Sequence, residues 1–310
     1  MIEQTLNEAF DYARAHIHKG KVASYIPELA KANPGHLGAC VITVEAREFH
    51  VGDWQRQFTM QSVAKTITLI LALKLVGEKA VFSKVGVEPS GDTFNSMVRL
   101  ETAHLPLNPM INAGAIAVAG CCISASGNAY AAFMELARKL CAREDIGMDE
   151  DVYHSEQKSG MRNRSMAYFM QGEGILDCDA AEAADFYFRT CSTLANTHDL
   201  AHYALVLANN GKNPLTGEVL VEDWIARIIK TLMLTCGMYD GSGEFAIKAG
   251  MPAKSGVGGG IMAAAENRLG MATFGPALNR KGNSVGGLLI VEYLSEKLGL
   301  HLFSGNSGGN

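Results

Sequence analysis

Ser62 and Lys65 stand three positions apart in a Ser-x-x-Lys pattern, directly before an apolar run from Ile67 to Leu73. Residues at this spacing share one face of a helix, so a neutral lysine amine could reach the serine hydroxyl and take its proton. Neutrality requires a lowered pKa, which burial on an apolar helix or a neighbouring cation would supply. The pair therefore predicts a serine nucleophile with a lysine base, which is the chemistry of acyl transfer.

The Ser-x-x-Lys pattern is weak evidence by itself. Ser155-Glu-Gln-Lys158 repeats it in a polar segment without a buried helix behind it, and there we predict no catalytic pair. On the motif alone, a helix N-cap at Ser62 and a surface charge at Lys65 are the better explanation.

A second motif, Lys254-Ser-Gly-Val257 followed by three glycines, strengthens the case. A Lys-Ser/Thr-Gly segment on a sheet edge is the usual companion of Ser-x-x-Lys in penicillin-recognising serine enzymes. Glycines let a substrate approach the backbone, so an N–H near Val257 could join that of Ser62 as an oxyanion hole. Lys254 would be a second cation that keeps Lys65 neutral. A flexible glycine loop is the alternative, whereas no phosphate-binding motif is formed.

With these motifs in place, the sequence resembles the bacterial-type glutaminase family over nearly its whole length. The ankyrin repeats of animal relatives are not in this sequence, so we expect a catalytic domain alone. The matching stretches, in chain order, are Tyr25-Ile-Pro-Glu-Leu-Ala, Gln61-Ser62-Val-Ala-Lys65, Asn108-Pro-Met-Ile-Asn112-Ala-Gly-Ala-Ile, Ser155-Glu156-Gln, Arg162-Asn163-Arg164, Asp185-Phe-Tyr187, Cys191-Ser-Thr-Leu, Gly237-Met-Tyr239-Asp and Lys254-Ser-Gly-Val257-Gly-Gly-Gly.

The resemblance implies a β-lactamase-like fold and the hydrolysis of free L-glutamine to glutamate and ammonia, without a metal or another cofactor. Ser62 would attack the γ-carboxamide and Lys65 would be its base. Tyr239, and with it Tyr25, would relay protons or orient the amide, with Lys254 as a further catalytic residue. The residues implied to hold the substrate are Ser62, Asn112, Glu156, Asn163, Tyr187, Tyr239 and Val257.

The chemistry of these side chains suits the polar head of an amino acid. A buried ammonium group needs a carboxylate partner, and Glu156 could be that partner. The α-carboxylate needs neutral donors such as Asn or Tyr, which bind it without adding a competing cation. Without the family match, Glu156 would be interpreted as a solvated charge and Tyr187 as a core aromatic residue.

Two other functions stay open at this point. A penicillin-binding or β-lactamase-type serine acyl hydrolase shares both lysine motifs, but it should also carry a Ser-x-Asn or Tyr-x-Asn element between them. Arg162-Asn163-Arg164 lacks that form, although Asn163 could lie analogously. A non-catalytic amino-acid-binding module would bind glutamine and release no ammonia.

His198-Asp-Leu-Ala-His202 places two histidines at the helical spacing of some zinc sites. It has Asp where a metalloprotease has its general base Glu, and no third ligand is evident. An amphipathic helix with Thr197 as its N-cap is the favoured interpretation, and we predict no metal site.

The composition of the chain limits the classes of partner that we expect. The chain of 310 residues has a formal net charge of -5, with 48% hydrophobic and 19% charged residues, which is typical of a soluble globular protein without a nucleic-acid-binding surface. The longest apolar stretch, Ile67 to Val76, contains Lys74 and is too short to span a bilayer, so we expect no membrane partner. The acidic N-terminus is unlike a signal peptide, and the seven irregularly spaced cysteines indicate reduced thiols. We therefore expect a cytoplasmic protein, and the resemblance implies a homodimer or homotetramer.

These residues need a scaffold, and hydrophobic periodicity predicts an α+β one. Strands and helices occupy both ends of the chain while the middle is helical, so we expect one antiparallel sheet flanked by terminal helices, with an inserted all-helical subdomain. Within a single domain 1–310, residues 1–58 plus 236–310 form the sheet part and 59–235 the helical part. The predicted helices are 2–18, a short one starting at Tyr25, 61–77, 129–140, 180–190, 198–209 and 285–298. The predicted strands are 39–45 with a hairpin partner from His50, 261–265 and 270–274, and a flexible tail is predicted over 304–309.

Overall fold

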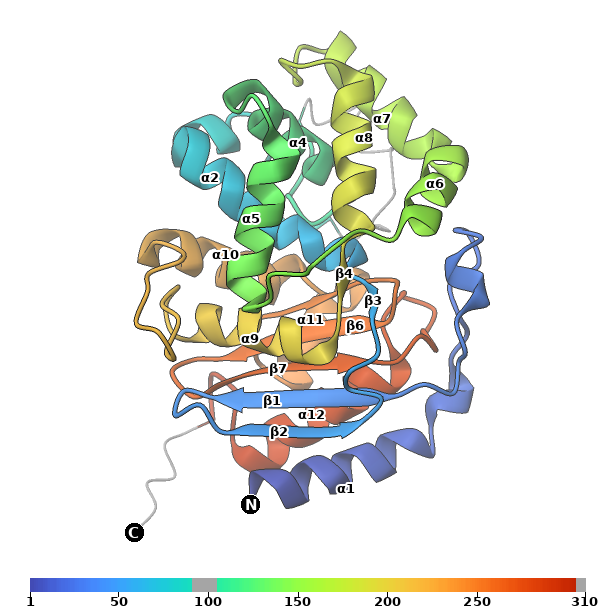
Figure 1. The fold of residues 1–310 in the computed structure, drawn as a ribbon, viewed down its shortest axis with the longest axis vertical. Helices are drawn as coiled ribbons and strands as arrows, with labels where there is room; N and C mark the ends of the chain where they lie inside the picture. The colour runs from blue at the N-terminus through green and yellow to red at the C-terminus, as the bar shows by residue number, and fades with distance from the viewer. Residues whose placement is uncertain (91–104, 305–310) are drawn as a thin grey trace.

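The computed structural model describes residues 1–90 and 105–304, which form a sheet half and a helical half (Figure 1). The sheet has five antiparallel strands in the order β2-β1-β7-β6-β5. Strand β1, near the N-terminus, pairs with β7, near the C-terminus, so the sheet unites both ends of the chain as predicted. The strands are β1 Gly38–Thr43, β2 Glu48–Gly52, β5 Ala253–Ser255, β6 Gly260–Ala265 and β7 Leu269–Phe274.

Helices cover both faces of this sheet, and the alternation of side chains along β1 shows why. Ala39 and Val41 pack into the core shared with α1 (Ile2–Arg14) and α12 (Val285–Leu298). Cys40 and Ile42 point to the opposite face and join the core that contains α9 (Thr197–Ala208). Every residue of β1 is buried, as expected for a strand with an apolar layer on each side.

Helix α9 lies directly against the middle of the sheet because β7 has a glycine there. A Cβ atom at Gly270 would lie only 2.1 Å from the Leu205 nitrogen and 2.2 Å from the Ala201 oxygen. Only a residue without a side chain permits this approach. The helix thereby fixes the sheet beneath the helical half of the molecule.

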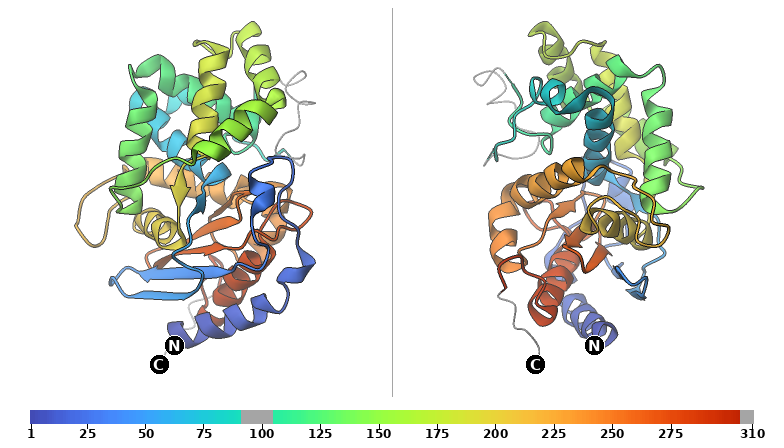
Figure 2. Two further views of the ribbon diagram at one scale, coloured as in Figure 1. Left: turned by 45° about the vertical axis from the view of Figure 1, so that its right-hand side comes forward. Right: turned by 90° about the vertical axis from the view of Figure 1, so that its left-hand side faces the viewer.

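The helical half stands on top of the sheet half in all three views (Figures 1 and 2). Its central helix α2 is buried from Ala64 to Leu73, surrounded by the neighbouring helices. The larger helices are α2 Ala64–Phe82, α4 Asn112–Ala125, α5 Ala129–Cys141, α6 Glu150–Ser159, α7 Met161–Gly172, α8 Ala180–Cys191, α10 Asp223–Cys236 and α11 Ser242–Lys248. The short elements are the 3-10 helices η1 Ile17–Lys19, η2 Leu29–Lys31, η3 Gln61–Val63 and η4 Tyr239–Gly241, and the two-stranded sheet of β3 Phe58–Thr59 and β4 Leu194–Ala195.

The predicted helices and strands are present, with differences at their ends, except the short helix expected to start at Tyr25. Residues 25–28 are not helical, because Pro27 disfavours the α conformation of the residue before it, and only the 3-10 helix η2 follows. The helix predicted to stop at Gly77 bends there, at a φ of 79°, and continues to Phe82. The predicted cap at Thr197 is wrong, since Asn196 is the N-cap and forms a capping box with Asp199, while the Thr197 hydroxyl donates to the Trp54 oxygen. Asn196 caps the helix because its side-chain amide oxygen accepts a hydrogen bond from the Asp199 N–H. Of the predicted tail, residues 305–309 lie outside the described residues.

The two histidines of the zinc-like spacing have separate partners. His198 Nε2 lies 3.3 Å from a Glu48 carboxylate oxygen, and His202 Nδ1 lies 2.8 Å from the Leu140 oxygen. Among the described residues, no group of three or more His, Cys, Asp or Glu side chains is placed to hold a metal ion.

No single helix in residues 1–90 and 105–304 has the length and apolarity to cross a membrane. Helices α4 and α5 pass that test by length and composition only when they are taken together as one bent pair.

The contact at Gly270 predicts a large loss of stability on substitution. Gly270→Val should lower the free energy of unfolding by about 3 kcal/mol, because the new side chain must displace the backbone of α9 from β7. Urea unfolding followed by circular dichroism would measure this. Gly172→Ala is the matched control, since a Cβ at Gly172 meets nothing within 4 Å. An unfolding midpoint for Gly270→Val equal to that of the control would contradict the close approach.

Candidate active site

Ser62 lies where the chain turns from β3 through η3 into the buried helix α2. The preceding residue, Gln61, has a left-handed φ of 49°, which turns the backbone sharply before the helix begins. The segment after β5 approaches this turn closely, because a Cβ at Gly256 would lie 2.5 Å from the Met60 oxygen and 3.4 Å from the Ser62 nitrogen. Ser62 is 6% exposed, at the boundary between the two halves.

Two backbone N–H groups point to an oxyanion site at this boundary. The N–H groups of Ser62 and Val257 donate to no backbone or side-chain acceptor in the described residues. Both residues are almost fully buried, and buried N–H groups normally have a partner. A pair of unused donors from a helix start and a glycine-rich turn suits a developing negative charge on a substrate oxygen.

Lys65 is buried in α2 with its amine facing away from solvent. Its Nζ donates to the Met110 oxygen at 2.9 Å and to Asn112 Oδ1 at 2.7 Å. Burial lowers the pKa of Lys65 to about 8, although Cys191 and Glu156 act in the opposite direction. A neutral amine has two N–H donors and one lone pair, so the two acceptors leave the lone pair unused. In the described residues no hydrogen bond joins Nζ directly to Ser62.

The direct partner of Ser62 is Tyr239 instead. The Tyr239 hydroxyl donates to the Ser255 oxygen at 3.2 Å and is also hydrogen-bonded with Ser62. Because the phenol has one hydrogen, the Ser62 hydroxyl is the donor in the second bond. Burial raises the pKa of Tyr239 to about 12, although its hydrogen bonds with Ser62 and Ser255 act in the opposite direction. The proton of Ser62 therefore points toward the phenol oxygen.

Tyr239 is held in an unusual conformation by its surroundings. Its φ of 57° is left-handed, at the first residue of η4. The side chain of Asn283 connects η4 to β5, since it accepts from Ser255 Oγ at 2.6 Å and donates to the Met238 oxygen at 3.2 Å. The fully buried Lys254 lies under the ring, with Nζ 4.5 Å from its centre, and donates to the oxygens of Gly237 and Ser255. Burial, and next the charge of Lys65, lower the pKa of Lys254.

Four helices contribute polar side chains to the opposite wall: Asn112 from α4, Glu156 from α6, Asn163 from α7 and Tyr187 from α8. Glu156 is 5% exposed and accepts from Gln61 Nε2 at 2.8 Å. Burial raises the pKa of Glu156 to about 7, although the Gln61 hydrogen bond and the Lys65 charge act in the opposite direction. Asn112 Nδ2 donates to Asn163 Oδ1 at 3.0 Å. In the described residues Glu156 has no salt-bridge partner, so it can accept a cation from outside.

A cleft of about 90 Å³ collects most of the predicted site residues. Lys65, Lys254 and Tyr239 do not line it, and they reach it through the contacts given above. The predicted residues in its wall are Tyr25, Ser62, Asn112, Glu156, Asn163, Tyr187 and Val257. Their assembly in one place is observed, whereas their individual roles stay predictions.

The interpretation of the sequence left out two residues of this site, and it was wrong about the structure of one segment. Gln61 lines the cleft and positions Glu156, and the Cys191 thiol is hydrogen-bonded with the Tyr187 hydroxyl. Both residues stand in the stretches that carry the family resemblance, which was the available signal. The segment containing Ser155 is helical, not an open polar segment, because α6 buries Val152, Tyr153 and Glu156. Lys158 is nevertheless exposed, which fits the prediction of no catalytic pair there.

Similarity to known proteins extends over almost the whole chain. A family model described as Glutaminase matches residues 20–303. Glutaminase 2 of Clostridium perfringens is 46% identical over 301 residues, which cover 96% of this chain and 99% of that protein. The glutaminase of Clostridium tetani is 46% identical over 309 residues, which cover 98% of this chain and 100% of that protein.

Solved structures agree with the fold. A probable glutaminase, ybaS, superposes with a TM-score of 0.90 at 36% identity, over 97% of this chain and 99% of that one. The covalent complex between the Bacillus subtilis glutaminase YbgJ and 5-oxo-L-norleucine, formed by reaction with 6-diazo-5-oxo-L-norleucine, superposes with a TM-score of 0.89 at 33% identity, over 97% and 99%. The expected β-lactamase-like fold is thereby confirmed.

The raised pKa of Glu156 predicts a pH-dependent cost to stability. Between about pH 4.3, the ordinary glutamate value, and pH 7, the folded protein keeps a proton that the unfolded chain has lost. The stabilising contribution of this site is therefore present at low pH and is lost as the pH rises through about 7. Glu156→Gln should thus gain stability relative to the wild type from pH 5 to pH 7, a window in which Lys65 is protonated in both states. If the unfolding free energies of the wild type and of Glu156→Gln changed with pH to the same extent, the raised pKa of Glu156 would be contradicted.

Proposed function

The chain belongs to the glutaminase family of amidohydrolases, and from this premise we propose that it hydrolyses free L-glutamine through a γ-glutamyl ester on Ser62. The observation that carries the proposal is the pair of unused N–H donors at Ser62 and Val257, beside a serine hydroxyl that donates to Tyr239. The nucleophile and the oxyanion donors thus line one cleft, and the proton acceptor Tyr239 contacts the nucleophile from behind its wall. Of the functions that the motifs left open, this is the one that the family supports.

The cleft suits the head group of a single amino acid. The buried carboxylate of Glu156 would bind the α-ammonium group, which gives both charges a partner in a site of low dielectric constant. The amide groups of Asn112 and Asn163 and the hydroxyl of Tyr187 would hold the α-carboxylate as neutral donors. With the head group held on the helical wall, the γ-carboxamide reaches Ser62 on the opposite side.

The chemical steps follow from the proton positions. As Ser62 Oγ attacks the carbonyl carbon of the γ-carboxamide, its proton moves along the existing hydrogen bond to the Tyr239 oxygen, and Tyr239 passes a proton on. The neutral Lys65 is the base that finally accepts it, since its lone pair is unused. The N–H groups of Ser62 and Val257 stabilise the oxyanion. The amide nitrogen takes up a proton and leaves as ammonia. Water then hydrolyses the ester by the same steps in reverse.

Ser62→Ala tests the nucleophile. Ammonia release from glutamine should fall by at least about 1,000-fold, because no other group can form the ester. Glutamine binding measured by calorimetry should remain. Ser155→Ala is the matched control, since it removes the serine of the second Ser-x-x-Lys pattern and should leave ammonia release unchanged. Peptide mapping after reaction with 6-diazo-5-oxo-L-norleucine should place the adduct on Ser62, and an adduct on any other residue would refute the scheme.

The pH dependence of kcat tests the base. Lys65 is active when neutral, and its pKa is about 8 before substrate binds, so kcat should fall on the acidic side of a pKa that is no higher than about 8. Saturating glutamine separates this limb from the titration of Glu156, which acts on binding and therefore on KM. Lys65→Arg should lose kcat at every pH, because the guanidinium stays charged. A kcat that is constant from pH 6 to pH 9 would exclude Lys65 as the base.

The oligomeric state and the cytoplasmic location stay predictions. We propose a homo-oligomer, because the resemblance implies one, and size-exclusion chromatography with light scattering would determine its stoichiometry.

A further inference from the structure

Asn283 is a buried polar residue that does not line the substrate cleft, and both ends of its side-chain amide have partners. Its Oδ1 accepts from Ser255 Oγ at 2.6 Å, and its Nδ2 donates to the Met238 oxygen at 3.2 Å. Buried hydrogen bonds of this kind specify the relative position of the segments that they join. The amide therefore connects the end of β5 to the residue before η4.

Both contacts of Asn283 lead to Tyr239. Met238 directly precedes Tyr239, whose left-handed φ of 57° is a conformation that persists only where the surroundings determine it. Ser255 supplies the backbone oxygen that accepts from the Tyr239 hydroxyl at 3.2 Å. Asn283 thus holds the backbone from which the Tyr239 side chain begins and also the residue at which its hydroxyl ends.

The phenol hydrogen of Tyr239 determines the direction in which a proton can move. Because this hydrogen is donated to the Ser255 oxygen, the phenol oxygen accepts the proton of Ser62. A shift of Ser255 away from the phenol would let Tyr239 donate to Ser62 Oγ instead, and Ser62 would then lose the acceptor of its proton. The hydrogen bond from Ser255 to Asn283 therefore preserves the productive direction of this contact.

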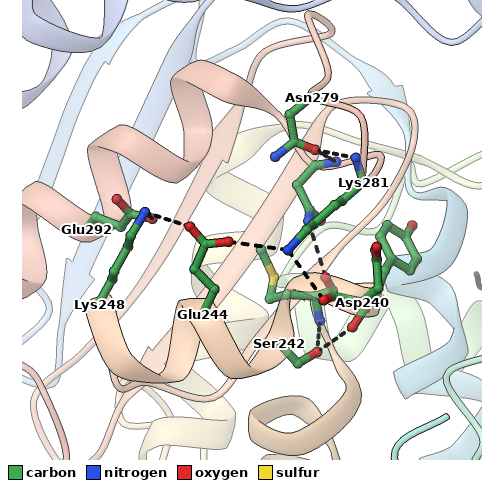
Figure 3. Close-up of polar contacts among 10 residues, drawn as sticks. Asp240, Ser242, Glu244, Lys248, Asn279, Lys281 and Glu292 are labelled. Atoms are coloured by element: carbon green, nitrogen blue, oxygen red, sulfur yellow. Dashed lines mark hydrogen bonds and ion pairs between the residues drawn. The ribbon is translucent and has the colours of Figure 1, made fainter. Parts of the chain in front are cut away.

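Asn283 is presented by a closed turn that begins at Asn279 (Figure 3). The side-chain oxygen of Asn279 accepts from the N–H groups of Lys281 and Asn283, at 2.9 and 3.1 Å, and the Asn279 N–H donates to the Asn283 oxygen at 2.8 Å. Lys281 ties this turn to α11, because its Nζ lies 3.3 Å from Glu244 Oε2. Ser284, the next residue, is the N-cap of α12. Asn283 is thus fixed between a hydrogen-bonded turn and a helix.

The Ser242 hydroxyl supports the same conformation of Tyr239 from a neighbouring position (Figure 3). Ser242 Oγ accepts from the Met238 N–H at 3.0 Å and donates to the Tyr239 oxygen at 2.8 Å. These contacts join residues three and four positions apart, so they stabilise the local turn wherever it lies on the sheet. The contact from Asn283 comes from 45 positions further along the chain, and it relates that turn to β5.

We propose that Asn283 is a positioning residue, which keeps the phenol oxygen of Tyr239 directed at the Ser62 hydroxyl. It acts through its hydrogen bonds with Met238 and Ser255. The inference rests on the proposed function, in which Tyr239 receives the serine proton. Because Asn283 does not line the cleft, its amide affects the rate of the chemical step and not the binding of glutamine.

Asn283→Ala tests this role through the separation of kcat from KM. We expect kcat for glutamine to fall roughly 100-fold, because a displacement of about 1 Å in a reacting group has an effect of that size. KM should stay within about threefold of the wild-type value, since no contact with the substrate is lost. Ammonia release at varied glutamine concentrations measures both. An unchanged kcat, or a loss expressed in KM alone, would overturn the proposal.

Asn213→Ala is the matched control for the loss of a buried asparagine. Asn213 also lies in a turn, where its side-chain oxygen accepts from the Leu215 N–H at 2.9 Å, and it does not line the cleft. Its removal should lower the unfolding temperature but leave kcat within about twofold of the wild type. If both variants lost kcat to the same extent, a specific role of Asn283 would be contradicted.

The variant Tyr239→Phe separates positioning from a merely structural role. A phenylalanine has no hydroxyl to orient, so the addition of Asn283→Ala to Tyr239→Phe should lower kcat by less than about threefold. A further loss of roughly 100-fold in this background would refute the proposal, because Asn283 would then act independently of Tyr239. Tyr239→Phe alone tests the premise. If its kcat equalled that of the wild type, the proton transfer of the proposed function would be contradicted, and not only the role of Asn283.

Ser255→Ala provides a second measurement that does not depend on the stability of Asn283→Ala. It removes only the hydroxyl that donates to Asn283, and it leaves the backbone oxygen that accepts from Tyr239. We expect kcat to fall roughly tenfold with an unchanged KM, because one of the two contacts of Asn283 is lost. Combined with Asn283→Ala, it should give the kcat of Asn283→Ala alone. A wild-type kcat for Ser255→Ala would overturn the proposal.

Discussion

The burial of two lysine amines in one site is the constraint on which the rest of this structure depends. Lys65 and Lys254 are both almost completely buried, and each is hydrogen-bonded to backbone oxygens. Two charged ammonium groups in the same low-dielectric region repel each other, and burial disfavours either charge. The pair is therefore most stable with at least one amine neutral, and a neutral amine is a base. The basicity needed for chemistry follows from where the fold places these side chains.

The fold assembles this pair from its two halves. Lys65 comes from the central helix of the helical half, and Lys254 comes from the edge strand of the sheet. They share a site because the segment after β5 approaches the turn before α2 at Gly256, where a side chain would strike the Met60 oxygen. Glycine at this position thus does more than provide flexibility. It brings Val257 to the same cleft as Ser62, and the proposed oxyanion site requires that approach.

The fold and much of the site could be predicted from the sequence, because both depend on patterns that local physics produces. Apolar strands, amphipathic terminal helices and the spacing of Ser62 and Lys65 are all patterns of this kind. The left-handed backbone of Gln61 and Tyr239 could not be predicted, since neither residue type favours it and only tertiary contacts hold it. The same is true of Glu156, whose burial depends on how the helices α6 to α8 pack.

Glu156 and Lys65 also link binding to chemistry in the proposed function. The carboxylate of Glu156 acts to raise the pKa of Lys65, against the larger effect of burial. An empty site thus has an anion that favours the protonated, inactive form of the base. When the α-ammonium group of a substrate neutralises that anion, its influence on Lys65 is cancelled and the pKa of Lys65 falls further. Only a ligand with a cationic head group has this effect, so the same contact that selects an amino acid also releases the proton from the base. Selection of the substrate and activation of the nucleophile are then one electrostatic event.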